Sequence, residues 1–284
     1  MKPELIVGRG PVLYVFDYGD HALKAFSVDG RLLWRFGRKG SGPGEFVNPT
    51  DLKIDGRDAV WLADPANSRV TIVDGHGRLV RTMPTTVAVE HLLPLATGEF
   101  LGFGYSGDKP AFSRYDSLGH SAQPIGYPVW MDTVPSLVSE LRVAGSPDGR
   151  SAAVASYYSG RLLLMRHGAS GVREIPVVET QAFPTPITYS PSPRMTVRRF
   201  PPEARPLVRA LTADSEFVYA LIAGTHKERG RILDVYRLLD GSYHGSYLLP
   251  QPVAAMTVVA HGLAVLVNEP MPSLYYLERR APGR

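Results

Sequence analysis

The stretch that decides the fold is Phe36–Asp74, which reads FGRKGSGPGEFVNPTDLKIDGRDAVWLADPANSRVTIVD. It begins with a glycine-rich loop around Pro43. Two alternating apolar stretches follow at Thr50–Asp55 and Ala59–Asp64, and a third covers Arg69–Asp74. Alternation with a period of two is typical of β-strands, and glycine permits the tight turns between them. The stretch therefore predicts consecutive strands joined by short turns.

The same organisation recurs along the chain. Pro3–Asp17 overlays Thr50–Asp64 without a gap, and weaker copies follow at spacings of roughly 40–65 residues. Such a period indicates radial repeats of short strands. We predict an all-β fold, a six-bladed β-propeller with four-stranded blades, built as a single domain from residues 1–284. The second strand of each unit is expected at Val12–Asp17, Ala59–Asp64, Glu99–Gly104, Ser151–Ser156, Glu216–Leu221 and Leu263–Asn268.

The sixth unit is shorter than the others. It begins at Val253 and contains three strand-like runs, while Met1–Val7 already serves as the first strand of the first unit. Strand exchange between the two ends of a ring removes an open sheet edge. We therefore expect either a short final blade or a native strand upstream of Met1.

A family resemblance rests on three segments, GRKGSGPGEF, NPTDLKID and WLADPANSRVTIVDGHGRLV. They resemble an NHL repeat, which belongs to the six-bladed β-propeller class. Asp64, Asn67, Arg69 and Val70 stand where that repeat has D-x-x-N-x-R-V. The resemblance covers roughly residues 3–83. It implies a propeller fold with a structural role for these residues, and it implies no activity.

The composition excludes several classes of site. Cysteine is absent from the 284 residues, so disulfides, thiolate metal sites and a cysteine nucleophile are excluded. No apolar run approaches the roughly 20 residues needed to cross a bilayer. We expect a soluble protein, cytoplasmic as the chain stands and extracytoplasmic if an upstream segment is missing. The net charge of +4 suits ordinary solubility.

Familiar catalytic and metal-binding patterns are absent from the sequence. The eight histidines show no H-x-H or H-E-x-x-H spacing, and there is no G-x-S-x-G. We expect no metal and no cofactor, and the catalytic residues, if any, stay unknown.

One group of polar residues recurs at equivalent positions. Glu4, Asp51 and His91 fall at the start of the innermost strands of units one to three, and Arg142 and Arg209 lie near the same place in units four and five. Innermost strands line the channel of a propeller. These side chains are candidates for binding a cation or a polar ligand at the channel mouth. The alternative is that they are hydrated or paired with one another.

The segment Glu179–Pro206 interrupts the repeat between units four and five. Its seven prolines predict an irregular inserted loop (179–206) that lies on one face and reaches over the channel. Arginine forks and aromatic rings suit an anionic ligand or RNA. The alternative is that the arginines pair with nearby glutamates. The candidate binding residues here are Tyr189, Arg194, Arg198, Arg199 and Phe200.

Three functions remain open. The first is a monomeric, non-enzymatic binding module for a protein, a peptide or a small anionic ligand, with loops presented over the central channel. The second is an enzyme of the lactonase, lyase or strictosidine-synthase type, with His91 or Glu90 as base and Arg198 or Arg199 holding an anionic group. The third is RNA binding, with affinity that falls steeply with salt.

Overall fold

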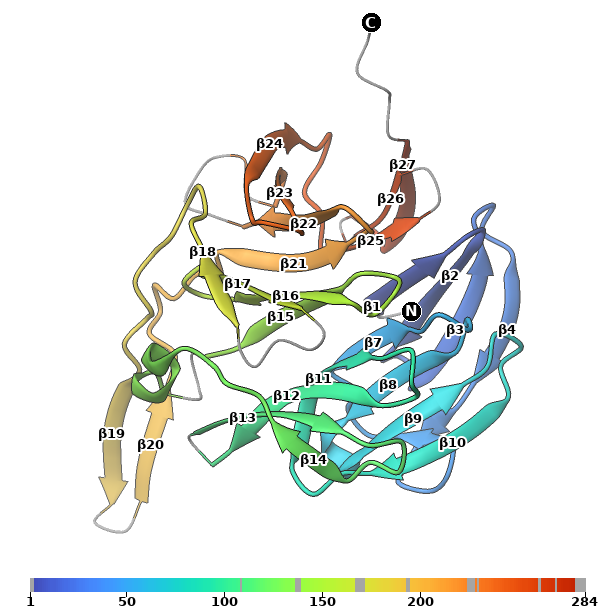
Figure 1. Cartoon of the computed structure of the whole chain (residues 1–284), viewed down its shortest axis with the longest axis horizontal. Coiled ribbons are helices and arrows are strands. Elements are labelled where there is room, and N and C mark those ends of the chain that lie inside the picture. Colours follow the sequence, from blue (N-terminus) through green and yellow to red (C-terminus); the bar gives the residue numbers. More distant parts are fainter. Residues whose placement is uncertain are drawn as a thin grey trace, which may run out of the picture.

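The chain folds into six antiparallel sheets arranged around a common axis (Figure 1). This computed structural model describes residues 3–107, 109–135, 139–166, 172–192, 195–223, 228, 230–259, 262–268 and 270–278. Five sheets have four strands, and the last has three within the described residues. The all-β, six-bladed prediction is confirmed.

The strands follow chain order within each sheet, from the axis outwards. Sheet by sheet they are β1 Pro3–Arg9, β2 Val12–Asp17, β3 Ala22–Ser27 and β4 Leu32–Phe36; β7 Asp51–Ile54, β8 Val60–Asp64, β9 Arg69–Val73 and β10 Leu79–Pro84; β11 Ala88–Pro94, β12 Phe100–Ser106, β13 Lys109–Tyr115 and β14 Ser121–Pro124; β15 Leu141–Gly145, β16 Ser151–Ser156, β17 Leu162–Arg166 and β18 Arg173–Ile175; β21 Val208–Ala213, β22 Phe217–Ile222, β23 Ile232–Arg237 and β24 Tyr243–Leu248; and β25 Ala255–Val259, β26 Gly262–Val267 and β27 Ser273–Glu278. Outside these sheets lie the short parallel pair β5 Arg38–Lys39 and β6 Glu45–Phe46, the hairpin β19 Ile187–Ser192 and β20 Met195–Arg199, and the 3₁₀ turns η1 Pro65–Asn67 and η2 Val129–Thr133.

The six expected second strands are β2, β8, β12, β16, β22 and β26. In β8 and β22 every residue is buried, because both faces of the sheet are covered by neighbouring blades. This burial explains why these strands carry near-continuous apolar runs and were the clearest repeat marker in the sequence. Neither 3₁₀ turn could cross a bilayer, and no helix of sufficient length and apolarity occurs elsewhere in the described chain.

The first strands of the six sheets form a closed ring around the channel. β1 contacts β7, and contacts continue through β11, β15 and β21 to β25, which returns to β1. Side-chain oxygens of one inner strand accept hydrogen bonds from the backbone of the next. Thr212 Oγ1 accepts from the Val258 N–H at 3.2 Å, and Thr257 Oγ1 accepts from the Gly8 N–H at 3.0 Å. These bonds satisfy inner-strand amides that have no sheet partner on the channel side.

The hydrophobic core is divided into clusters between successive blades. The cluster between the first two sheets includes Phe16 and Leu62, together with Phe46 from the glycine-rich loop. Comparable clusters join the second to the third, the third to the fourth, the fourth to the fifth and the fifth to the sixth sheets. The seam between the sixth and first sheets is smaller. Its buried members are Leu13, Val259 and Ala264 among the residues described.

The motif residues fasten the glycine-rich loop. Asp64 is fully buried, and its carboxylate accepts the backbone N–H groups of Val47 and Asn48 at 3.0 and 3.1 Å. The Asn67 amide donates to Asp64 at 2.8 Å, and Arg69 donates to backbone carbonyls in the loop. The structural role implied by the NHL resemblance is thus a network that pins the loop to β8 and β9.

Gly37 is the glycine in this loop with the strongest conformational requirement. Its φ is +93°, and a Cβ there would come within 2.5 Å of the Phe46 ring. Both the backbone angle and the close packing therefore favour glycine.

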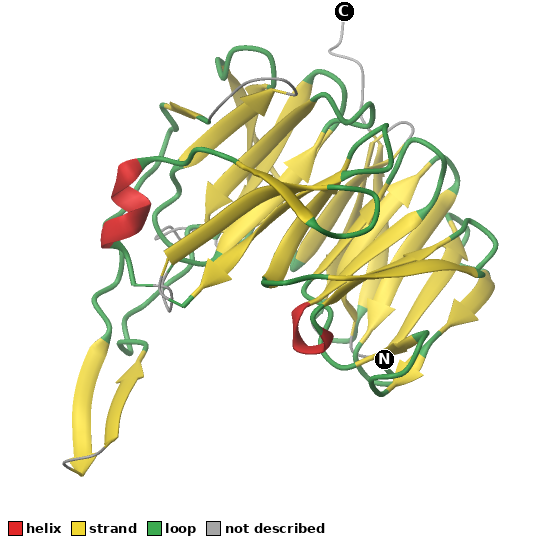
Figure 2. Cartoon of the chain, turned by 60° about the horizontal axis from the view of Figure 1, so that its bottom comes forward, coloured by secondary structure: helices red, strands yellow, loops and turns green. Residues whose placement is uncertain are grey.

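The inserted segment differs from its prediction in two respects, its strand content and its direction. Part of it, β19 and β20, is a regular hairpin, although the prolines predicted no strand at all. Most prolines flank the hairpin, and Pro191 sits where the β19–β20 register shifts, so it interrupts no continuous ladder. The hairpin projects outwards from the ring in both Figure 1 and Figure 2 and does not cover the channel. The position of the insertion between the fourth and fifth blades is as predicted.

Replacing Asp64 with Ala tests the loop network. The change leaves two buried backbone N–H groups without an acceptor, so we expect the free energy of unfolding to fall by about 2–4 kcal/mol. Urea denaturation measures the loss.

Glu216→Ala, at an exposed position in a turn, is the matched control and should change the unfolding free energy by less than about 0.5 kcal/mol. Equal stability of Asp64→Ala and the wild type would show that the motif does not fasten the loop.

Candidate functional site

A cavity of about 790 Å³ opens at the end of the channel where the inner strands begin. We call it the mouth cavity. All six blades contribute to its wall, as expected for a site on the ring axis. Its charged lining residues are Asp51, Lys53, Glu90, Glu140, Arg142 and Arg209, together with His91.

Four of the five residues predicted at the starts of the inner strands meet in this cavity. Asp51, His91, Arg142 and Arg209 all line it. Glu4 lies in β1, at the same end of the ring, but its side chain is outside the described part of the structure. The strand alignment thus brought these positions together, and their binding of a ligand stays a prediction.

Asp51 is the most constrained group of the site. One carboxylate oxygen accepts the Leu52 N–H at 3.0 Å and also the Lys53 ammonium. The other accepts the Leu92 N–H at 2.9 Å and lies 3.8 Å from Nδ1 of His91. Asp51 therefore joins the second blade to the third while it fixes the position of two cavity residues.

The environment of Asp51 favours its charged form. Burial alone would raise the pKa of this carboxyl, but the Lys53 charge and the hydrogen bond and charge of His91 outweigh burial and hold the pKa below its usual range. Asp51 is consequently ionised at neutral pH and serves as a fixed negative charge.

Arg142 is also held rigidly. Its guanidinium donates to the carbonyls of Arg209 and Leu141 at 2.9 and 2.7 Å and pairs with Glu140 at 2.7 Å. Its plane lies over the ring of Tyr157, 4.1 Å from the centroid. These partners fix the position of the Arg142 guanidinium, and Glu140 neutralises part of its charge. The group therefore forms a fixed part of the cavity wall.

Two charged groups of the mouth cavity have no side-chain partner among the described residues. Within the described residues, neither the Arg209 guanidinium nor the Glu90 carboxyl has an ion pair or side-chain hydrogen bond. Burial raises the pKa of Glu90, His91 opposes this rise, and the charge of Glu140 adds to it. Arg209 is exposed to solvent at the mouth.

The opposite wall of the cavity is mainly apolar. The first and sixth blades contribute Leu5, Ile6, Ala254, Ala255 and Met256 to it, together with the uncharged polar residues Tyr18 and Asn268. Charged groups come from the second to fifth blades, so the mouth cavity is polar on one side and apolar on the other.

The basic and aromatic residues of the insertion lie elsewhere. Tyr189, Arg198 and Arg199 are exposed on the hairpin, where the Arg199 guanidinium sits 5.7 Å from the Tyr189 ring centroid. Arg194 is outside the described residues. Phe200 packs on Tyr158, with ring centroids 5.5 Å apart. Since the hairpin points away from the ring, Arg198 and Arg199 are not brought to His91 or Glu90, and the proposed catalytic combination of these four is not assembled in the mouth cavity.

Sequence analysis missed Lys53, Glu140 and Tyr157. Lys53 and Glu140 each lie two residues from a chosen residue, Asp51 and Arg142, and a period of two places such neighbours on the same strand face. That spacing could have identified them. Tyr157 follows the end of β16, and no spacing rule pointed to it. No group of three or more metal-binding side chains occurs among the residues that the structure describes.

Asp51→Asn tests the central ion pair. The change leaves the half-buried Lys53 ammonium without its counter-charge, so we expect a loss of about 3 kcal/mol in unfolding free energy at pH 7. Because the folded-state pKa of Asp51 lies below the unfolded value, its contribution is complete above the unfolded value of about 4 and is lost as the pH falls towards the folded value. Urea denaturation between pH 7 and pH 2 should show the gap between wild type and variant closing below about pH 4.

Asp132→Asn, at an exposed position, is the control and should leave the unfolding free energy nearly unchanged at every pH. A gap of constant size down to pH 2 would contradict the proposed ionisation of Asp51.

Comparisons with known proteins agree with this architecture. No family model matches the chain. NHL repeat-containing protein 3 of Homo sapiens is 34% identical over 73 residues, which cover 22% of this chain, and the Mus musculus protein is 35% identical over 75 residues, which cover 25%. In each case the match spans about a fifth, 21%, of the relative's own length.

Two solved structures match over nearly the whole chain. Hydrazine synthase of Kuenenia stuttgartiensis superposes with a TM-score of 0.57 at 9% identity, covering 97% of this chain and 96% of that one. A catalytically inactive variant of virginiamycin B lyase from Staphylococcus aureus, solved with quinupristin, gives 0.56 at 11% identity and covers 97% and 84%. At such identities the likeness concerns the fold alone. From its repeats, its ring of sheets and these partial matches, the chain is an NHL-like six-bladed β-propeller.

Proposed function

We propose that the chain is a non-enzymatic binding module that holds a small anionic ligand in the mouth cavity. The observation that carries this proposal is the uncommitted guanidinium of Arg209 at the edge of a 790 Å³ cavity. This volume falls within the range of small-molecule sites, roughly 300–1,000 Å³. Exposed guanidinium groups bind carboxylate and phosphate oxygens through paired hydrogen bonds.

The charge balance of the cavity supports an anion over a cation. Asp51 is neutralised by Lys53, and Glu140 is neutralised by Arg142. Arg209 then remains as a positive charge that, among the described lining residues, is opposed by Glu90, whose raised pKa favours its neutral form. Protonation of Glu90 would leave the described part of the mouth with a net positive charge.

The apolar wall suggests the rest of the ligand. Ile6 and Met256 offer surface for a hydrocarbon or aromatic part opposite the charged side. Because inner strands form this wall, the site is rigid and needs little ordering when a ligand binds. An anion with an apolar part therefore fits the cavity better than a fully polar one.

Sulfate is a suitable probe of the anion site because it keeps its charge throughout the neutral and mildly acidic range. We expect Arg209→Ala to weaken sulfate binding about tenfold, the loss of one charge-assisted contact. Glu90→Gln should strengthen it about threefold at pH 7, since the variant removes a nearby negative charge. Wild-type affinity should rise as the pH falls and Glu90 takes up its proton, whereas Glu90→Gln should lose much of this dependence. Isothermal titration calorimetry measures each affinity.

Arg57→Ala is the matched control, because Arg57 is an exposed arginine in the turn between β7 and β8, at the far end of the ring. It should leave sulfate affinity unchanged. If Arg57→Ala and Arg209→Ala weaken binding equally, the anion site is not at the mouth.

A second candidate function, catalysis, rests on the Asp51–His91 pair. A buried carboxylate lies 3.8 Å from Nδ1 of His91, and a carboxylate next to a histidine is an arrangement that acid–base catalysis uses. Glu90 lies beside this pair in the same cavity. The two structural neighbours described above carry enzyme names, which shows only that similar propellers can host chemistry.

The catalytic alternative predicts a clear result with any substrate found by screening lactones, esters and lyase substrates. His91→Ala should lower kcat by at least about a hundredfold, the usual contribution of a positioned base. His76→Ala, in an exposed turn, should leave kcat unchanged. Turnover that survives His91→Ala and Glu90→Gln together would remove this alternative and leave the binding module.

A further inference from the structure

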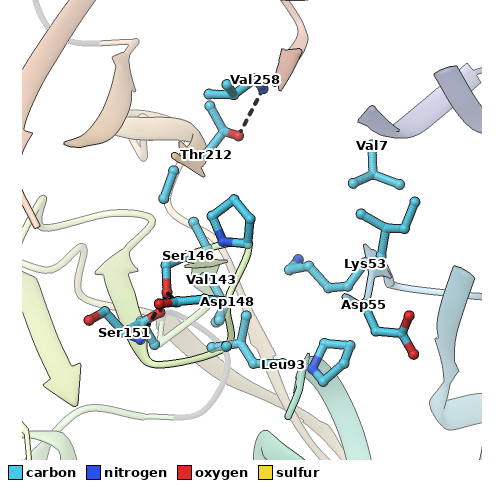
Figure 3. A pocket seen from close by; sticks show the side chains of 18 of the residues that line it. Val7, Lys53, Asp55, Leu93, Val143, Ser146, Asp148, Ser151, Thr212 and Val258 are labelled. Carbon is cyan, nitrogen blue, oxygen red and sulfur yellow. Dashed lines mark hydrogen bonds between the residues drawn. The ribbon is translucent and has the colours of Figure 1, made fainter. Parts of the chain in front are cut away.

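The channel has a second cavity, at the end opposite the mouth. It measures about 350 Å³ and lies where the inner strands finish (Figure 3). We call it the far cavity. Its wall is formed mainly by apolar side chains, among them Val7, Leu93, Val143, Leu211 and Met256. Val143, Leu211 and Met256 also line the mouth cavity, so the two cavities meet at a waist in the channel.

The polar groups at the rim of the far cavity are already used by the fold. Ser146 Oγ donates to Asp148 at 2.6 Å and accepts the Ser151 N–H at 2.9 Å. Thr212 Oγ1 accepts the Val258 N–H. Asp55 accepts the Trp61 indole N–H at 2.9 Å. Because these groups have partners, they offer a ligand little. Three arginines also line the far cavity: Arg9 pairs with Asp58 at 2.6 Å, Arg166 donates to the Leu239 carbonyl at 3.0 Å, and Arg150, whose side chain is 83% exposed, lies 3.9 Å from Asp148.

Lys53 is different from the rim groups. Its side chain points into the far cavity in Figure 3, and 17% of it is exposed. The ammonium has three N–H donors, and the contact with Asp51 accounts for one of them. Asp51 in turn receives two backbone N–H groups besides Lys53. The positive charge of Lys53 is therefore shared with a carboxylate that has other donors, and the ammonium has no second hydrogen-bond partner among the described residues.

We propose that the far cavity binds a small aliphatic carboxylate, with its hydrocarbon part against the apolar wall and its carboxylate on the Lys53 ammonium. The apolar part of the wall of this cavity, whose volume is about 350 Å³, favours a hydrocarbon chain. A carboxylate enters an apolar cavity only if a partner balances its charge. Among the described lining residues, Lys53 is the cationic group that points to the channel waist. Lys53 also lines the mouth cavity, so this site differs from anion binding by Arg209 in its need for Lys53 and for the apolar wall of the far cavity.

Octanoate and its uncharged analogue 1-octanol are the probes, with binding measured by isothermal titration calorimetry on the whole chain. Octanoate should bind the wild type at least tenfold more tightly than octanol, because only the carboxylate can use Lys53. Lys53→Met should remove this preference, whereas Lys53→Arg should keep octanoate affinity within about threefold of the wild type. Lys24→Met is the matched control, since Lys24 also pairs with a buried carboxylate, Asp17, but lines neither cavity.

A cavity-filling variant keeps the test decisive if Lys53→Met does not fold. Val7→Trp places a large side chain in the far cavity and should abolish octanoate binding, while Val28→Trp, on the exposed outer surface, should not. Arg209→Ala should leave octanoate affinity unchanged.

Three outcomes would overturn the proposal. The first is the absence of saturable octanoate binding up to about 10 mM. The second is equal affinity for octanoate and octanol. The third is octanoate binding that is lost in Arg209→Ala but retained in Val7→Trp. The last outcome would place the carboxylate at the mouth and so favour the proposed function while rejecting a far site.

Discussion

The whole structure depends on burying both faces of each central sheet against the neighbouring blades. β8 and β22 are buried along their full length, which is possible only when a blade stands on either side. No blade could be stable alone, because an isolated sheet would expose one or both of these apolar faces. Closing the ring through β1 and β25 gives each end blade a second neighbour, with a smaller apolar seam than between the other blades. It also creates the channel on which both cavities lie.

The inner strands also need hydrogen-bond acceptors from outside their own sheets, because their amides on the channel side lack sheet partners. Threonine and aspartate side chains supply the missing acceptors. Thr257 bonds to the first blade, Thr212 to the sixth, and Asp51 to the third. Asp51 thus joins two blades and also places a negative charge in the mouth cavity. The ionised form serves both roles. Some polar groups take no part in this network and are available to a ligand. They are Arg209 and Glu90 at the mouth and the remaining donors of Lys53 at the waist.

Much of the fold could be predicted from sequence because fully covered strands have a strong apolar signal. The second strands of all six blades were predicted in this way, and their spacing, together with the NHL resemblance, predicted the ring. The positions of Asp51, His91, Arg142 and Arg209 followed from the same alignment, since equivalent inner-strand positions meet at one end of the channel. The hairpin β19–β20 was missed because proline content was taken to exclude strands, whereas Pro191 falls at a register shift that tolerates it. The contact between Phe200, at the end of the hairpin, and Tyr158 joins residues far apart in the sequence, and no local pattern encodes it.

The seam between the sixth and first blades has a consequence for the order in which the molecule comes apart. It holds three buried apolar residues in the part described, against nine or more in each of the five inter-blade clusters that join the other neighbouring sheets. Local opening starts where the fewest apolar contacts must be broken. The ring is therefore expected to open first at the seam between the sixth and first blades. Amide protons of β1 and β25 that face the seam would exchange with solvent ahead of those in β8 or β22, and the seam would be the first part of the ring to lose its protection.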